Sequence, residues 1–274
     1  MKGFIVRLGI CWWLLLAEAA AQDAGQALAW ARTMAESRPT EAMRILRRVT
    51  FFSGGDTAFE AYALMGRLAF RQHNPQAAED YFQRASLLAP SDSLRKVLVY
   101  ERAAAQILQK KWQTALWTLE AEGDTADRIY LILKGTAHWG ALNDSAARAA
   151  WLRAAPDSTT RSRIATLLRR PRRYRQPSPR LAYYLSMGVP GLGQAYAGYP
   201  GEAVHSFLLV GSLASLTAYL AFRYSLFDAL GSANWAVRYL YGGANKAEKL
   251  AARRRNQKRK QLYEKVLREL YARP

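Results

Sequence analysis

The sequence has few of the residues on which metal, cofactor and nucleophile chemistry depends. Cys11 is the only cysteine, and the three histidines, His73, His138 and His205, lie far apart in the chain. No two of them have the spacing of metal ligands, and neither a GxSxG sequence nor a P-loop is present. We therefore expect no catalytic, cofactor or metal site. No disulfide can form if the leader that contains the cysteine is removed.

Acidic residues are scarce in the last third of the chain. Residues 169–274 contain 19 Lys/Arg and 5 Asp/Glu, a net charge of 19 − 5 = +14, whereas residues 23–168 contain 19 and 15, a net of +4. The basic character therefore belongs to the C-terminal part. This distribution argues against a general polyanion-binding role for residues 23–168.

Residues 1–21 have the three features of a secretory signal peptide. Lys2 and Arg7 precede the apolar run LGICWWLLLA (8–17), and the small residues Ala19 and Ala21 follow it. We expect cleavage after Ala21, with Ala19 as the alternative site. An uncleaved N-terminal anchor is the second interpretation. Both interpretations place the rest of the chain, up to the next membrane segment, outside the cytoplasm.

Residues 22–168 are predicted to form successive pairs of helices. This stretch has little Gly or Pro and is rich in Ala, Leu, Arg and Gln, which favour helix. In the unit Phe59–Asp92, small residues at Gly66 and Ala78 would let two antiparallel helices approach, and Phe82 would fill the space before the next pair. The packing positions of this unit are Gly66, Ala78, Phe82, Ala85 and Pro90, and those of a second unit from Arg128 are Gly135, Ala147, Trp151 and Ala154.

These positions resemble the 34-residue tetratricopeptide repeat, with weaker matches between and before the two units. The resemblance implies a solenoid whose concave surface binds a peptide or a protein, so it implies a scaffold and not a catalyst. A generic array of helical hairpins is the alternative. Exposed candidates for partner contacts on the first helices of the pairs are Arg67, Arg71, Arg102, Gln106 and Lys134.

The composition changes abruptly after Leu168. Residues 169–180 (RRPRRYRQPSPR) contain six Arg, three Pro and no acid, which is typical of a linker. Leu181–Gly201 and Ala203–Phe222 contain no charged residue, and about 20 apolar residues cross a hydrocarbon core of about 30 Å. Within residues 181–243 we therefore predict a membrane hairpin made of Leu181–Tyr199 and Ala203–Phe222.

A glycine-rich string, PGLGQAYAG (190–198), lies at the predicted turn of this hairpin. A dinucleotide-binding GxGxxG is excluded, because Tyr196 occupies the sixth position and no strand or suitably placed acid accompanies it. The string resembles the PGxGQxYxG signature of small membrane-hairpin domains in bacterial envelope proteins of unknown function. The resemblance covers about residues 181–260 and implies that one set of residues ends the first membrane helix and forms the turn: Pro190, Gly191, Gly193, Gln194, Tyr196 and Gly198.

Residues 225–243 are apolar and aromatic but carry Asp228, Asn234 and Arg238. They are predicted to form either an interfacial helix or a third membrane span. Asp228 and Arg238 are candidates for an intramembrane pair, because lone charges in the bilayer are costly.

Residues 244–274 are predicted to form a basic amphipathic helix. Residues 246–274 contain 11 Lys/Arg and 3 Glu, which suits an anionic lipid surface. The side of the membrane on which this tail lies is open. The leader places residues 169–180 outside, whereas the positive-inside rule places both basic segments inside. Two spans would leave the tail outside, and three would bring it inside.

The sequence as a whole predicts an all-α protein: a tetratricopeptide-like solenoid, then a transmembrane helical hairpin, then a basic C-terminal helix. We expect a scaffold or adaptor of the bacterial inner membrane, with periplasmic repeats that bind a protein and a C-terminal part that binds membrane lipid. No nucleic acid or small-molecule substrate is expected. The alternative is an integral-membrane transporter subunit or lipid-acting enzyme with accessory repeats.

Overall fold

The computed structural model describes residues 24–169 and 176–271. The predicted leader and most of the Arg/Pro linker lie outside these residues. All regular elements in the described part are helices, so the predicted all-α class is confirmed. The chain divides into two compact units, residues 1–161 and 162–274, whose boundary falls within helix α9 (Ser158–Leu168).

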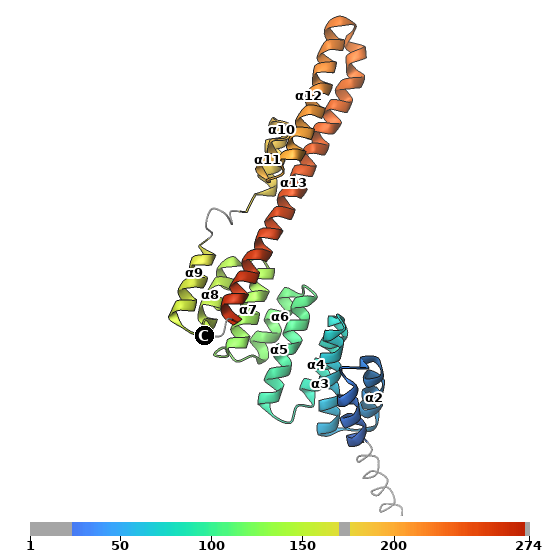
Figure 1. The fold of residues 1–274 in the computed structure, drawn as a ribbon, viewed down its shortest axis with the longest axis vertical. Helices are drawn as coiled ribbons and strands as arrows, with labels where there is room; N and C mark the ends of the chain where they lie inside the picture. Colours follow the sequence, from blue (N-terminus) through green and yellow to red (C-terminus); the bar gives the residue numbers. More distant parts are fainter. Residues whose placement is uncertain (1–23, 170–175, 272–274) are drawn as a thin grey trace, which may run out of the picture. The chain divides into compact units, whose positions relative to one another are not determined.

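The first unit is a succession of helices joined by short turns (Figure 1). It begins with a helix over residues 24–34. The helices that follow are α2 (Pro39–Phe52), α3 (Gly55–Arg71), α4 (Pro75–Leu87), α5 (Asp92–Leu108), α6 (Trp112–Glu122), α7 (Arg128–Gly140) and α8 (Asp144–Ala154).

The turns α3–α4, α5–α6 and α7–α8 have the same backbone geometry. His73, Lys110 and Leu142 have φ angles of 58°, 62° and 65°, and each ends the first helix of its pair in the left-handed conformation. In all three turns the next residue donates its N–H to the carbonyl five positions earlier, at 2.9 Å. The side chains of Asn74 and Asn143 then cap α4 and α8. These three helix pairs are therefore joined by turns of one kind.

Small side chains fill much of the space between these helices. One cluster joins the helix 24–34, α2 and α3 through Leu46, Met65 and Leu68, with Ala31, Ala42 and Ala61 buried beside them. A second cluster joins α3, α4 and α5 and contains Phe82 and Leu98 with Ala63, Ala69, Ala78, Ala85 and Ala105. Alanine at these positions allows the helix axes to approach closely, so that the larger side chains fill the remaining volume.

The second unit contains α10 (Pro179–Gly188), α11 (Leu192–Tyr196), α12 (Pro200–Arg223) and α13 (Leu226–Tyr271). In Figure 1, α12 runs beside the first half of α13, and α10 and α11 lie against α13. In the described part of the chain, only α12 is long and apolar enough to cross a membrane. Only 6% of its most apolar stretch is buried.

The predicted hairpin of Leu181–Tyr199 and Ala203–Phe222 is wrong in its first helix. Residues 181–199 do not form one span: α10 has 10 residues, α11 has 5, and a turn separates them. Ten helical residues rise about 15 Å, which is half of a hydrocarbon core. The long antiparallel partner of α12 is instead the first half of α13.

The predicted boundary between residues 225–243 and the basic tail is also absent. α13 is one continuous helix of 46 residues that passes through Gly242 and Gly243. Glycine normally weakens a helix by about 1 kcal/mol relative to alanine. At Gly243 an added Cβ would lie 2.9 Å from Ser206 Oγ on α12, so the lack of a side chain there permits the close approach of the two helices.

Candidate functional site

The glycine-rich string forms two turns around the short helix α11. Gly191 precedes α11 with φ +90°, and Gly198 follows it with φ +85°, in the left-handed region that favours glycine. A Cβ at Gly191 would lie 2.3 Å from the carbonyl oxygen of Ala203. A Cβ at Gly193 would lie 1.9 Å from the carbonyl oxygen of Ala182, so α11 packs directly against the backbone of α10.

A hydrogen-bond network centred on Gln194 joins α10, α11 and α13. The Gln194 side chain is fully buried; its Oε1 accepts a hydrogen bond from Ser186 Oγ at 2.6 Å, and its Nε2 donates to the carbonyl of Gly243 at 2.9 Å. Ser186 Oγ accepts in turn from the backbone N–H of Gly193 at 3.1 Å. We call Ser186, Gly193, Gln194 and Gly243 the Gln194 network.

The sequence singled out Gln194 but not its partners. The sequence assigned Gln194 to the turn, whereas its side chain also bonds the backbone carbonyl of Gly243, 49 residues further along the chain. Ser186 and Gly243 were missed. The signal that could have found Ser186 is the pair of small residues Ala182 and Ser186, four apart on α10, which is typical of a close helix contact. The single aromatic residue of the string, Tyr196, accepts a hydrogen bond from the Ser178 N–H at 3.1 Å.

A small cleft of about 270 Å³ lies beside the network, between α12 and α13. Its polar lining consists of Gln194, Glu202, His205, Ser206 and Lys246. Lys246 Nζ lies 2.5 Å from Glu202 Oε2, so the two charges neutralise each other. Across the described residues, no three His, Cys, Asp or Glu side chains are grouped to hold a metal ion.

Asp228 and Arg238 do not form the predicted pair. Both lie on α13, and ten helical residues separate them by about 15 Å along the helix axis. Asp228 Oδ2 accepts a hydrogen bond from Ser225 Oγ at 2.7 Å, and the Asp228 backbone N–H donates to Ser225 Oγ at 3.2 Å. The guanidinium of Arg238 lies over the ring of Trp235, with 5.5 Å between its carbon and the ring centroid.

In the repeat region, a glycine faces an aromatic ring in two of the helix pairs. A Cβ at Gly66 would lie 2.5 Å from the ring of Phe82, and a Cβ at Gly135 would lie 2.4 Å from the indole nitrogen of Trp151. The nearest neighbour of Gly66 is thus Phe82 of its own pair, not Ala78 as predicted. The other packing positions Ala78, Ala85, Ala147 and Ala154 are buried, and Pro90 is exposed in the loop before α5.

One of the five residues predicted to be exposed on the first helices is in fact buried. Gln106 is fully buried, and its amide donates to Glu79 Oε1 at 2.9 Å. Burial raises the pKa of Glu79, but hydrogen bonds from Gln106, Lys111 and Gln109 outweigh it, so the pKa is below its ordinary value. This polar cluster ties α4 to α5 and α6 and is not a free binding surface.

Two of the four charged candidates on the first helices form ion pairs with acids on other helices. Arg67 Nε lies 2.8 Å from Glu101 Oε1, and Lys134 Nζ lies 3.0 Å from Glu120 Oε1. Burial, followed by the positive charge of Lys134, lowers the pKa of the adjacent His138 below its ordinary value.

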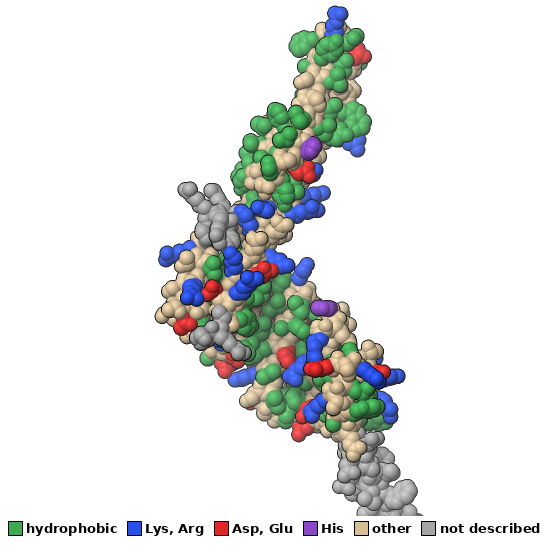
Figure 2. All heavy atoms as spheres, viewed as in Figure 1, with side chains coloured by type: hydrophobic (Ala, Val, Ile, Leu, Met, Phe, Trp, Pro, Cys, Tyr) green, Lys and Arg blue, Asp and Glu red, His purple; other side chains and the backbone are tan. Residues whose placement is uncertain are grey.

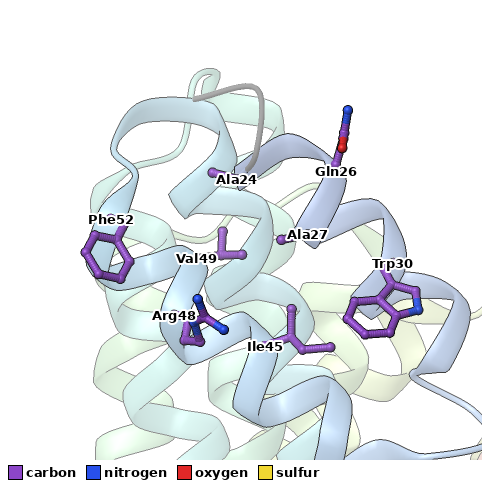
Figure 3. Close-up of a pocket in the computed structure, with 8 residues that line it drawn as sticks. All are labelled: Ala24, Gln26, Ala27, Trp30, Ile45, Arg48, Val49 and Phe52. Carbon is purple, nitrogen blue, oxygen red and sulfur yellow. The ribbon is translucent and has the colours of Figure 1, made fainter. Parts of the chain in front are cut away.

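An open groove of about 620 Å³ lies at the N-terminal end of the first unit (Figure 3). Trp30 comes from the helix 24–34, and Ile45, Val49 and Phe52 come from α2. Trp30 is 60% exposed and Phe52 69%, although both side chains are large and apolar. Arg48 is the charged residue of the lining. This groove was not predicted from the sequence.

Comparison of the chain with protein-family models, with curated proteins and with solved structures finds no match. The geometry of the described residues is therefore the basis for a functional proposal.

Proposed function

We propose that this protein is a membrane-anchored helical-repeat scaffold that binds a protein partner in the bacterial envelope. The observation that carries the proposal is the exposure of α12. This helix has 24 residues and no charge from Ala203 to Phe222, yet Phe207, Leu208 and Phe222 are each more than half exposed. Apolar surface of this extent is costly in water and stable in a bilayer, so α12 is suited to be a membrane anchor.

The partner-binding part of the proposal is supported by the groove of the first unit. Exposed Trp and Phe side chains are enriched in protein interfaces, where they become buried at the centre. The groove combines Trp30 and Phe52 with aliphatic side chains and Arg48 at its edge. A helix or an extended peptide with an apolar face would cover this surface.

The proposed location is the bacterial inner membrane, with the repeats on the periplasmic side. This assignment rests on the signal-peptide features of residues 1–21, which lie outside the described residues. The scaffold is proposed to be non-catalytic.

Membrane anchoring is tested by alkaline carbonate extraction of full-length protein. The unmodified chain should stay in the membrane pellet, because α12 is held in the hydrocarbon core. Leu216→Arg puts a charge near the centre of α12, which costs about 2.5–3.5 kcal/mol of insertion free energy and should shift the protein to the soluble fraction. Leu216→Ala is the matched control and should stay in the pellet. Quantitative extraction of the unmodified chain would refute the anchor.

Partner binding is tested by photocrosslinking from the groove. A benzoylphenylalanine in place of Gln26, at the edge of the groove, should capture one dominant envelope protein in intact cells. Phe52→Glu should abolish the adduct, because a carboxylate replaces an apolar wall of the groove. Phe51→Glu is the matched control: Phe51 is adjacent and 81% exposed, but it does not line the groove. Equal loss of the adduct in both variants would contradict the proposal.

The alternative, a transporter subunit or lipid-acting enzyme, is supported by the polar cleft between α12 and α13. Its polar groups include a neutralised pair, Glu202 with Lys246, and the side chain of Gln194, which is engaged by Ser186 and Gly243. This alternative predicts a transport or lipid-turnover activity that Glu202→Gln abolishes without a loss of inserted protein. Unchanged activity in that variant would exclude a role for the cleft.

A further inference from the structure

α12 and the first half of α13 are paired along their whole common length. At the base of the pair Glu202 meets Lys246, with 2.5 Å between the charged atoms. Towards the other end Thr217 Oγ1 lies 3.0 Å from Ser232 Oγ. The partners run in opposite directions along the two helices, and the connection at Tyr224 and Ser225 is short. Any membrane depth reached by a residue of α12 is therefore also reached by its partner on α13.

The apolar surface covers both helices of this pair, which we call the α12–α13 hairpin (residues 200–243). On α12 the exposed apolar residues include Phe207, Leu208, Leu216 and Phe222, and on α13 they include Leu226, Phe227, Leu230, Trp235 and Val237. Figure 2 shows hydrophobic side chains over the visible face of the hairpin. Ala203–Phe222 rises about 30 Å, which equals the thickness of a hydrocarbon core.

By itself, the first half of α13 is a poor membrane span. It carries Asp228, Asn234 and Arg238, and unlike α12 it is not apolar enough to qualify as a membrane span. Asp228 lies in the turn at the tip, where it is bonded to Ser225. Arg238 lies between the depths of Ser232 and Gly243, with its guanidinium over the Trp235 ring. This segment would therefore enter a bilayer only together with the more apolar α12.

Cationic side chains gather just beyond the base of the hairpin. Lys249, Arg253 and Arg254 are exposed on α13 directly after the apolar part, and Arg180 is exposed in the first turn of α10. The cluster Ala182, Ala197, Ala247, Leu250 and Ala251 holds α10 and α11 against this same part of α13. Tyr184 and Tyr196 are exposed there, and tyrosine is enriched at membrane interfaces. A cationic collar next to an apolar hairpin complements an anionic phospholipid surface.

We propose that α12 and residues 226–243 of α13 insert into the bilayer together as one helical hairpin, with the collar on anionic headgroups at its base. The crossing number is then two, and the chain before α12 lies on the same side of the membrane as the chain after residue 243. The proposal rests on the membrane anchoring proposed above. It replaces the pairing expected from the sequence and assigns the basic end of α13 to the side of the repeats.

The test is cysteine accessibility in the full chain, after Cys11→Ser has removed the only native cysteine. Single cysteines are introduced at Ser145 in the repeats, Tyr224 at the hairpin tip and Gln257 in the basic part, all three exposed. In sealed membranes of known orientation, an impermeant maleimide should label Ser145→Cys and Gln257→Cys from the same side. It should label Tyr224→Cys from the opposite side. The labelling rate from that side should be at least tenfold higher than the rate from the side on which Ser145→Cys and Gln257→Cys react.

Two results would overturn the proposal while leaving the anchor intact. The first is labelling of Ser145→Cys and Gln257→Cys from opposite sides of the membrane. The second is a Tyr224→Cys that the maleimide does not label from the side opposite to Ser145→Cys. Failure of the anchor is distinguishable, because the protein would then be extracted by carbonate.

A second measurement checks the helix pairing. Thr217→Cys with Ser232→Cys should form a disulfide in the membrane, whereas Leu216→Cys with Ser232→Cys should not, because Leu216 is exposed. Equal crosslinking of both would also overturn the proposal.

Discussion

Replacing Gln194 by leucine tests whether the Gln194 network holds α11 and α10 against α13. The fully buried amide makes two hydrogen bonds, to Ser186 Oγ at 2.6 Å and to the Gly243 carbonyl at 2.9 Å. Leucine removes both but keeps much of the side-chain volume. Each neutral hydrogen bond contributes about 0.5–1.5 kcal/mol net, so the local opening free energy should fall by about 1–3 kcal/mol. That loss corresponds to a roughly 5- to 150-fold higher population of the open state.

The assay is hydrogen–deuterium exchange of the full-length protein in detergent micelles, because exchange reports local opening in a multi-unit chain. The amides of α11 and of α13 around Gly243 should exchange faster in Gln194→Leu, while those of α3 to α8 should not change. Tyr196→Phe is the control: it removes one exposed hydrogen bond, to the Ser178 N–H, and should accelerate exchange by about fivefold or less. Unchanged protection around Gly243 in Gln194→Leu would refute the role of the network.

Three further predictions concern the repeats and the hairpin. Gly135→Ala would crowd the Trp151 ring and should lower the local stability of α7 and α8 by about 1 kcal/mol, after the helix-propensity gain is subtracted. Gly25→Ala is the control, because open space surrounds Gly25, and it should not lower stability. An equal response of hydrogen exchange to both substitutions would contradict this prediction. Burial and a neighbouring lysine lower the pKa of His138, so the unfolded state binds the proton more tightly. The stability of the first unit should therefore fall as the pH drops below about 6.5, less so in His138→Gln, as measured by denaturant titration at pH 5 and pH 8. Arg238→Leu should favour hairpin insertion by about 3 kcal/mol in a membrane-insertion assay; weaker insertion would mean that a protein partner holds the guanidinium.

The helices of the repeat region could be predicted because their determinants are local. Gly66 and Phe82 are 16 residues apart (82 − 66), as are Gly135 and Trp151 (151 − 135), and both pairs lie in contact in the structure. The turn geometry could not be predicted. Leu142 takes the left-handed conformation, which costs a branched residue about 1–2 kcal/mol and which sequence preference alone disfavours. The packing of α7 against α8 imposes it.

At the candidate site, the string 190–198 identified the turn glycines and Gln194 but not the surfaces that they contact. Gly193 and Gly191 pack against the carbonyls of Ala182 and Ala203, and Gln194 donates a hydrogen bond to the carbonyl of Gly243. Every residue has a backbone carbonyl, so these contacts leave no signature in the sequence. The separation of 49 residues between Gln194 and Gly243 lies beyond the reach of any periodicity argument. The groove at Trp30 and Phe52 was missed for the same reason, because it depends on how two helices meet.

The sequence by itself determined the all-α class, the helical pairs, the apolar character of α12 and the position of the glycine turn. Each of these depends on residues within a few helical turns of one another, so composition and spacing are sufficient. Only the tertiary structure decided which helix pairs with α12. Hydropathy ranks residues 181–199 above residues 226–243, but the left-handed Gly191 interrupts the first segment, while Ser206, Gly243 and the Glu202–Lys246 pair fit the second against α12. Helix pairing follows the shape and charge of facing surfaces, which are set only when distant segments meet.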